Sequence, residues 1–210
     1  NGYLLDADNV FIEKRSKPIS DVPSIVLGGQ AIDDGNFILK EEEKDELLKK
    51  EPQAEPFIRH YMMGKDFIDR RPRYCIWLKN ADPVLLKKCP QILHRVEMVK
   101  EFRNNSNRKN TKKAAETPTL FATIVEYEQS YIAIPKVSSE RRRYIPMDYL
   151  SGEIIPGDKL FTMPDATTYH FGILESNIHM AWMRAVCGRL KSDYSYSNTI
   201  VYNNFPWPSP

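Results

Sequence analysis

The sequence lacks the motifs on which most enzymes depend. It has no glycine-rich phosphate or dinucleotide loop, since Gly28-Gly29 is a lone pair, and it contains neither a CxxC nor an HExxH spacing. The four histidines have no acidic or cysteine partner at ligand spacing, so we interpret them as packed or hydrogen-bonded side chains rather than zinc ligands. These absences argue against catalysis by this chain, and no metal or catalytic residue is predicted.

Cysteines and long apolar runs are also scarce. The three cysteines, Cys75, Cys89 and Cys187, are odd in number, widely spaced and set in otherwise apolar or helical stretches. That pattern indicates buried free thiols in a reducing cytoplasm. No apolar run approaches the length that crosses a bilayer, and no signal peptide precedes Asn1. Because the chain starts without methionine, we expect a fragment of a longer protein.

Two catalytic arrangements come close without matching. A metal-dependent nuclease needs acids on adjoining strands, but Glu42-x-Lys44 belongs to a run of charges on a predicted helix. The segment 203–208 (NNFPWP) is similar to the Asn-Pro-Pro-aromatic motif of adenine methyltransferases, in which the ring stacks on a flipped base. Phe205 interrupts that order, and no glycine-rich cofactor loop lies upstream. Neither arrangement is accepted as an active site.

The charge of the chain is segregated. Its 210 residues, with 41% hydrophobic content, suffice for one good-sized core, and the formal net charge is +2. Acidic residues dominate 33–55, whereas 100–113, 136–143 and 184–191 are strongly basic. A near-neutral chain with separate basic stretches suits a module that contacts a polyanion with one face.

Local patterns predict an α+β fold. We expect short strands at 3–5, 25–27, 37–39, 73–79, 121–127, 131–135, 144–146, 159–163 and 167–171. The turn signal at 33–36 predicts a hairpin between the second and third of these. Prolines at the strand ends favour a mixed or antiparallel curled sheet, with several packed helices, over a parallel doubly wound one.

Helical patterns occupy the intervening stretches. The charged segment 41–50 has acids early and lysines late, as the helix dipole favours. A second helical pattern begins at Pro83 and runs to Asn104, and Pro90 is expected to split it in two. The following segment 104–113 (NNSNRKNTKK) is polar and basic, which predicts a mobile loop. Residues 57–68 have no pattern that can be assigned.

The stretch 169–208 is the most distinctive. A helix is predicted after a short extended run, with Ser176 placed to cap its first turn. Its apolar stripe consists of Ile178, Ala181, Trp182, Ala185 and Val186. Arginine, lysine, serine and tyrosine then alternate through 189–198, before an apolar strand and a proline-rich exit. A polar surface loop is the alternative to a binding loop at 189–198.

A second candidate binding segment is 136–143 (KVSSERRR), which lies between two predicted strands. Arginine donates bidentately to phosphate or guanine, while serine and glutamate can accept from cytosine or adenine amines. A solvated charged turn is the alternative. Three basic stretches, two of them interleaved with tyrosines, favour nucleic-acid binding.

Seven motifs, in this order over essentially the whole chain, resemble the target recognition domain of MmeI-like DNA methyltransferases. They are GGQAID (28–33), WLKNADP (77–83), IPKVSSERR (134–142), YHFG (169–172), HMAW (179–182), GRLKSDY (188–194) and YNNFPWP (202–208). The resemblance implies a bacterial, cytoplasmic parent chain that methylates the exocyclic amine of adenine, in many members with a nuclease domain.

The resemblance also implies a division of labour. S-adenosylmethionine would bind a methyltransferase domain upstream, and no cofactor is expected in this segment. Residues 1–208 would form the recognition domain, and 209–210 would begin a linker to a C-terminal region. The implied partners are double-stranded DNA, read largely in the major groove, and the methyltransferase domain of the same chain, which takes up the flipped adenine.

The family's base-reading positions match two places in this chain. The residues at these two places are Ser138, Ser139, Glu140, Arg141, Arg189, Lys191, Ser192, Asp193, Tyr194, Ser195 and Tyr196. One departure is that Ser195 stands where the family leads us to expect an arginine between two tyrosines. The phosphate contacts expected from the basic stretches are Arg108, Lys109, Lys112, Lys113, Lys136, Arg142, Arg143 and Arg184.

Two other functions stay open on the sequence alone. One is an RNA-binding or general nucleic-acid module, because tyrosines can stack on unpaired bases. The other is a protein-interaction domain whose basic loops meet an acidic partner. An adenine methyltransferase domain directly upstream in the same gene would argue against both.

Overall fold

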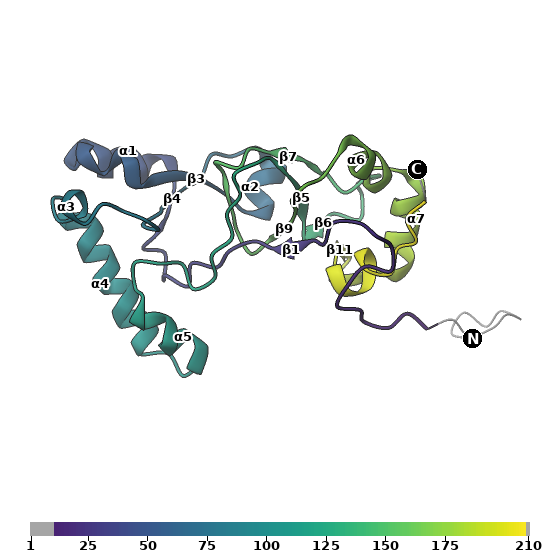
Figure 1. The fold of residues 1–210 in the computed structure, drawn as a ribbon, viewed down its shortest axis with the longest axis horizontal. Helices are drawn as coiled ribbons and strands as arrows, with labels where there is room; N and C mark the ends of the chain where they lie inside the picture. Colours follow the sequence, from purple (N-terminus) through teal and green to yellow (C-terminus); the bar gives the residue numbers. More distant parts are fainter. Residues whose placement is uncertain (1–10, 209–210) are drawn as a thin grey trace, which may run out of the picture.

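The computed structural model describes residues 11–208, which form an elongated molecule with helices at both ends and strands between them (Figure 1). One end carries α1 (Glu41–Lys50), α3 (Pro83–Leu86), α4 (Pro90–Asn104) and α5 (Lys109–Lys113). The other end carries α6 (Thr168–Leu174) and α7 (Asn177–Val186), while α2 (Gly64–Asp69) lies beside the strands. Shorter turns of 3-10 helix are η1 (Pro52–Phe57) and η2 (Ala114–Glu116), and η3 (Asn198–Tyr202) is a π-helix.

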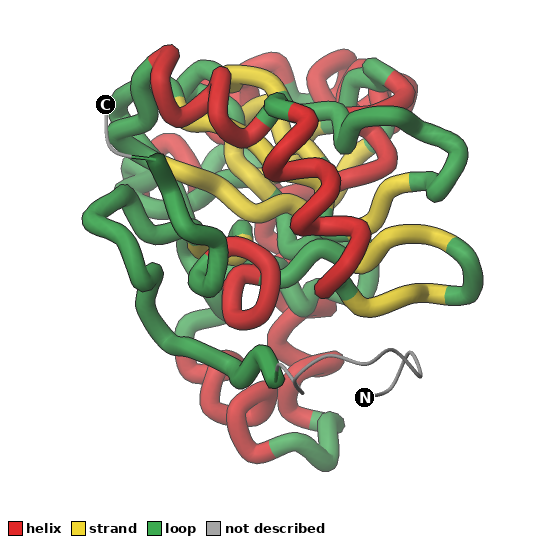
Figure 2. The backbone as a smooth tube through the Cα atoms, turned by 90° about the vertical axis from the view of Figure 1, so that its right-hand side faces the viewer, coloured by secondary structure: helices red, strands yellow, loops and turns green. Residues whose placement is uncertain are grey.

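Within the described residues the strands form three small sheets, seen between the helices and loops in Figure 2. The first is antiparallel, with the order β1 (Val26–Leu27), β9 (Leu160–Met163), β5 (Tyr131–Pro135), β7 (Asp148–Leu150). The second is mixed, with the order β2 (Ile38–Leu39), β4 (Tyr74–Ile76), β3 (Ile58–Met62), β8 (Ile155–Pro156). The third is antiparallel, with the order β10 (Gly188–Leu190), β11 (Asp193–Ser195), β6 (Val137–Ser138). The predicted α+β class with mixed and antiparallel pairing is confirmed.

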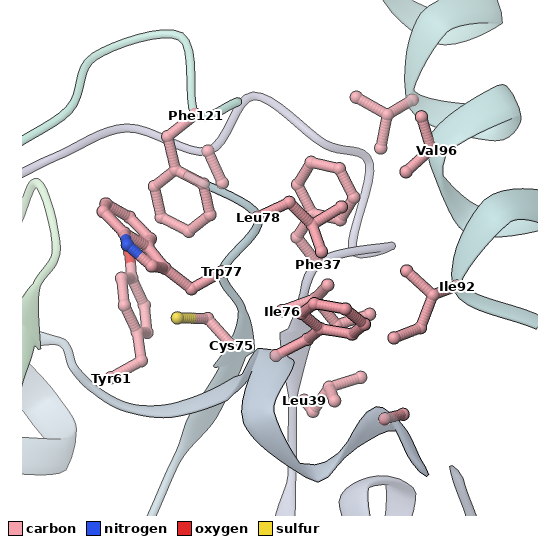
Figure 3. Packing of buried hydrophobic residues seen from close by; sticks show 14 of the residues in the cluster. Phe37, Leu39, Tyr61, Cys75, Ile76, Trp77, Leu78, Ile92, Val96 and Phe121 are labelled. Carbon is pink, nitrogen blue, oxygen red and sulfur yellow. The ribbon is translucent and has the colours of Figure 1, made fainter. Parts of the chain in front are cut away.

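Two hydrophobic cores stabilise the two halves of the molecule. In the first, side chains from β2, β4 and α4 surround a group of aromatic rings (Figure 3), and the rings of Trp77 and Phe121 pack edge to face with centroids 5.0 Å apart. The second core joins β5 and β9 to α7 and the C-terminal segment, where Met180 and Phe205 are fully buried or nearly so. Each half therefore has enough apolar burial to hold its own surface loops in place.

The glycine pair at 28–29 lies where the first sheet meets the second. A Cβ on Gly28 would lie 2.3 Å from the carbonyl oxygen of Gly157, and one on Gly29 would lie 2.8 Å from that of Thr123. No side chain fits at such distances, so the two backbones can approach only because both residues are glycine. The pair serves packing between the sheets.

The predicted hairpin across 25–39 is wrong, although its turn is present. The Asn36 N–H donates to the Asp33 carbonyl oxygen (3.0 Å), and the Phe37 N–H donates to the Asp33 carboxylate (2.6 Å). The flanking strands nevertheless separate, because β1 pairs with β9 and β2 pairs with β4. The turn carries the chain from one sheet to the other.

Arg103 explains why the predicted mobile loop at 104–113 is instead helix α5 packed on α4. Its guanidinium is completely buried and donates to five backbone carbonyl oxygens. They belong to Ala31, Ile32, Ala114, Thr117 and Leu120. The donor nitrogens lie on α4, and the acceptor oxygens lie on the segments around it. Arg103 therefore holds these segments against α4, which the polar sequence of 104–113 does not indicate. Burial lowers the pKa of Arg103.

The other helices on this side follow the sequence. The charged helix is α1, and Pro90 does separate α3 from α4. The strand patterns at 25–27, 37–39, 73–79, 131–135 and 159–163 correspond to β1, β2, β4, β5 and β9. The unassigned segment 57–68 contains β3 and most of α2, and the strand expected at 3–5 lies outside the described residues.

Four predicted strands are wrong, one of which, the apolar strand expected before the proline-rich exit, is the π-helix η3. Residues 121–127 are irregular apart from a bridge between Thr123 and Gln30, and 144–146 are also irregular, followed by β7, which was not predicted. Residues 167–171 instead begin α6. Thr167 caps that helix, since its N–H donates to His170 Nδ1 (3.0 Å). A local cap thus outweighs the strand propensity of this segment.

Candidate nucleic-acid interface

Helix α7 supports the candidate interface. Ser176 caps it as predicted, because its Oγ accepts from the His179 N–H (3.1 Å). The predicted apolar stripe, however, is not the buried face. Ile178 is 75% exposed and Ala181 and Ala185 are exposed, while Trp182 and Val186 are half-buried. The helix instead buries His179, Met180 and Met183, because a histidine and two methionines fill the core where aliphatic residues were expected.

The predicted loop after α7 is a β-hairpin. Strands β10 and β11 pair Gly188 with Ser195 and Leu190 with Asp193. Lys191 takes a left-handed backbone conformation (φ 57°) in the two-residue turn. The hairpin thereby projects a basic, polar tip from the end of α7.

Arg189 and Tyr194 stiffen this hairpin from one face. They are cross-strand partners, and the guanidinium lies 4.2 Å from the centroid of the tyrosine ring. Arg189 also donates to the Ser192 carbonyl oxygen across the turn (3.1 Å). Since Tyr194 is mostly buried, its ring supports the arginine instead of standing free to stack on a base.

Strand β6 brings the second predicted segment to the hairpin. Tyr194 pairs with Ser138 and Ser195 with Val137, so residues nearly sixty positions apart share one ladder. The Tyr196 N–H extends this contact to the Lys136 carbonyl oxygen (2.8 Å). The two segments that were singled out separately in the sequence therefore form one surface.

The exposure of the predicted base-reading residues divides them into three groups. Exposed side chains belong to Glu140, Arg141, Arg189, Lys191 and Ser192, and half-buried ones to Ser139, Asp193 and Ser195. Buried side chains belong to Ser138, Tyr194 and Tyr196. The exposed and half-buried residues lie on the turn after β6 and on the β10–β11 hairpin.

Tyr196 has a structural position that differs from its predicted role. Its ring is completely buried, and its hydroxyl lies 3.0 Å from His179 Nε2. In this position it cannot reach a base edge, so we remove it from the base-reading set. Burial lowers the pKa of His179 to about 4, and the imidazole is therefore neutral near pH 7. The pair anchors the base of the hairpin to α7.

The turn after β6 is also tied to α7. The Arg142 N–H donates to the Ser139 carbonyl oxygen (3.1 Å), which closes the turn. The Arg184 guanidinium donates to the Arg143 carbonyl oxygen, and Arg143 lies 5.4 Å from the centroid of the Tyr144 ring. These contacts connect the backbone segments that carry the cations at this end of the molecule.

The predicted phosphate contacts do not lie in one place. Lys136, Arg142, Arg143 and Arg184 belong to the turn and α7, near β6 and β11, whereas Arg108, Lys109, Lys112 and Lys113 belong to α5 at the opposite end (Figure 1). The three basic stretches of the sequence therefore contribute to two separate surfaces.

The C-terminal segment that resembles a methyltransferase motif is structural here. The Asn203 side chain donates to the Arg15 carbonyl oxygen (2.8 Å), and the Asn204 side chain donates to that of Glu13 (3.0 Å). Phe205 and Trp207 are buried in the second core. The two asparagines thereby fasten the first described residues to the C-terminal segment.

Two further cations beside the turn were not predicted from the sequence. Lys65 of α2 and Lys159, which precedes β9, line a cleft of about 420 Å³ together with Ser138, Ser139, Arg142 and Asp193. Lys65 lies in 57–68, the segment that had no assignable pattern. Lys159 follows Asp158 and is not part of a basic stretch. Only the folded chain places them beside the predicted contacts.

The remaining features are the cysteines, possible metal ligands and possible membrane-spanning helices. Cys75 and Cys89 are buried free thiols as predicted, but Cys187 is only half-buried. Among residues 11–208, no cluster of three histidine, cysteine or acidic side chains is arranged to hold a metal ion. No helix in that part of the chain is long and apolar enough to span a membrane.

The comparisons with known proteins agree with this geometry. The model of the MmeI target recognition domain matches residues 6–209. DNA methyltransferase A of Bacillus subtilis (strain 168) is 38% identical over 206 residues, which are 98% of this chain and 23% of that protein. The type IIL restriction-modification enzyme MmeI, solved in complex with DNA, is 40% identical with a TM-score of 0.95, covering 99% of this chain and 28% of that one.

The chain therefore belongs to the MmeI target recognition domain family, and the resemblance found in the sequence is confirmed. It spans about a quarter of the length of these two relatives.

Proposed function

We propose that this chain is the part of an adenine-specific DNA methyltransferase, or restriction-modification enzyme, that recognises a particular sequence in double-stranded DNA. The observation that carries the proposal is the β6–β11 ladder, which joins both segments of predicted base-reading residues into one exposed surface. Membership of the family and the DNA complex of a relative at TM-score 0.95 support it.

Base reading falls to the side chains that project from this surface. Glu140 and Asp193 are suited to accept from the amino groups of cytosine or adenine in the major groove, and Arg141 is suited to donate to guanine. Lys191 and Ser192 occupy the tip of the hairpin, and Ser195 lies beside them in place of the family's arginine. We assign Arg189 and Tyr194 the role of holding this tip in position.

Phosphate contacts would come from the cations around the surface. Lys136, Arg142, Arg143 and Arg184 surround the turn, and the cations of α5 would meet the backbone only if the duplex extends to the other end of the molecule. Such contacts raise affinity for every sequence and make it depend on salt concentration.

Methyl transfer is assigned to another domain of the parent chain. The one glycine pair here packs against backbone carbonyl oxygens at 2.3 and 2.8 Å from the ideal Cβ positions, so it offers no cradle for S-adenosylmethionine. We propose that residues 1–208 form the recognition domain, that 209–210 lead towards a following region, and that the methyltransferase domain takes up the flipped adenine in the bacterial cytoplasm. A nuclease domain in the parent chain is compatible with this arrangement.

Fluorescence anisotropy of the chain with random duplex DNA at low salt tests the proposal. We expect binding near or below about 10 µM that weakens steeply as salt is added, because phosphate neutralisation dominates non-specific affinity. An absence of binding at several times that concentration would contradict it. Single-stranded RNA should compete poorly, since Tyr194 and Tyr196 are buried and cannot stack on bases.

A further inference from the structure

The cleft that contains Lys65 and Lys159 lies directly beside the proposed base-reading surface. Its walls come from α2, from β6 with the turn that follows, and from the residue before β9. Asp193, the first residue of β11, stands at the same cleft. Whatever binds there would be next to the bases that the hairpin contacts.

The cations of the cleft have unused capacity. Lys65, Lys159 and Arg142 are all exposed, and Lys65 makes no ion pair within the described residues. Lys159 Nζ lies 3.4 Å from the half-buried Asp158 carboxylate, and since the lysine itself is exposed this is a weak surface pair. The cleft also holds two acids, Asp193 and Asp69, of which Asp69 is 3.7 Å from the Arg71 guanidinium, so the three cations outnumber the acids. The cleft therefore favours an anion.

Ser138 supplies an independent observation. Ser138 is one of the residues that line the cleft and is only 2% exposed, and its buried Oγ has no hydrogen-bond partner among the described residues. Buried hydroxyl groups in folded proteins are nearly always hydrogen-bonded. A phosphate oxygen is a strong acceptor for such a hydroxyl and for the neighbouring ammonium groups.

The walls of the cleft are held together by backbone contacts. A Cβ on Gly64 would lie 2.7 Å from the Lys159 carbonyl oxygen, so α2 packs closely against that residue. The Lys136 N–H donates to the same oxygen (3.0 Å), which fastens the start of β6 to it. Lys65, Lys159 and Ser138 thus project from one connected scaffold, and a group bound among them would have a fixed position relative to the hairpin.

We propose that this cleft binds one phosphate group of the DNA backbone through Lys65, Lys159 and the Ser138 hydroxyl, with Arg142 at its rim. The inference rests on the proposed function and adds α2 and the start of β9 to the DNA interface. A phosphate fixed at this point sets the register of the duplex, so that the hairpin meets the same base pairs in each encounter.

The test uses the full-length parent protein and a duplex that carries the motif it methylates. Binding is measured by anisotropy over a series of salt concentrations for wild type, for the double variant Lys65→Gln/Lys159→Gln, and for Lys49→Gln on α1 as a distant control. The double variant should lower the slope of log K against log[salt] by about 0.9, the value for one neutralised phosphate. The control slope should equal that of wild type.

A scan with single methylphosphonate linkages, which remove one phosphate charge at a time, then locates the contact. One linkage should weaken wild-type binding without weakening the double variant any further. Equal losses for both proteins at every linkage, together with an unchanged salt slope, would overturn the cleft site. Wild-type protein that shows no salt-dependent duplex binding would instead overturn the proposed function, so the two failures are distinguishable. Both lysines are exposed, and the variants are expected to fold like wild type.

Discussion

The two basic surfaces of the molecule have similar compositions but different supports. The hairpin surface, formed by the turn after β6 and by β10–β11, is held by a strand ladder, a stacked arginine and a buried histidine–tyrosine pair. The α5 surface is held from beneath by the buried guanidinium of Arg103. Only the hairpin surface carries the positions that match the family's base readers, so we propose base reading at that end and, at most, phosphate contact at the other.

Loss of the Arg103 donors should have the largest effect on stability. Arg103→Met keeps the length of the side chain but leaves the five carbonyl oxygens without their donor, so we expect the free energy of unfolding to fall by about 3 kcal/mol or more. Urea unfolding followed by circular dichroism measures this. The exposed Lys100→Ala serves as the control and should change stability little. A loss below about 1 kcal/mol for Arg103→Met would show that α5 is held by other contacts.

The hairpin support should instead respond to pH. Burial lowers the pKa of His179 from 6.5 to about 4, so between these values the unfolded chain binds a proton that the folded chain does not. Stability is therefore unaffected by this group above pH 6.5 and declines as pH falls below it, by about 2 kcal/mol between pH 7 and pH 5.

Urea unfolding at pH 7 and pH 5 checks that decline. His179→Gln should flatten it, because the variant has no group to protonate, whereas the exposed His94→Gln should keep it. If wild type and His179→Gln lose the same stability over this range, the buried histidine is not the source.

Single cations on the two surfaces should give smaller, comparable effects. Arg142→Ala and Lys112→Ala should each weaken duplex binding severalfold for all sequences alike, because each removes a phosphate contact. Anisotropy with the specific duplex and with random duplex measures the two losses. A Lys112→Ala protein that binds like wild type would show that the duplex does not reach α5 and would sharpen the contrast between the surfaces.

Much of the fold was accessible from local sequence signals. Pro90 divides the helices, Ser176 caps α7, and the strand pattern at 131–135 marks β5, because these depend on neighbouring residues alone. The hairpin predicted across 25–39 failed because its strands find partners in different sheets, which no local pattern records. Helix α5 was missed because its support, Arg103, acts through distant carbonyl oxygens.

The candidate site could be predicted mainly from the resemblance to a family, and much less from the physical properties of its residues. Glu140, in the turn after β6, and Asp193, at the start of β11, are brought together by the β6–β11 ladder, a pairing that the sequence could not show. Tyr196 was misplaced because the sequence pattern does not distinguish a tyrosine that faces solvent from one that reaches a buried histidine. Lys65 was missed because its segment has no recognisable pattern and approaches the turn only in the folded chain.

Methylome sequencing, which maps the motif methylated by the full-length protein, tests most directly whether the hairpin surface reads the bases. Variants Glu140→Gln, Asp193→Asn and Ser195→Arg alter proposed base-reading positions on the hairpin surface, and Lys112→Gln alters α5. We expect at least one hairpin-surface variant to methylate a changed or relaxed motif, while Lys112→Gln keeps the wild-type motif at reduced efficiency. An unaltered motif for all three hairpin-surface variants would contradict this expectation.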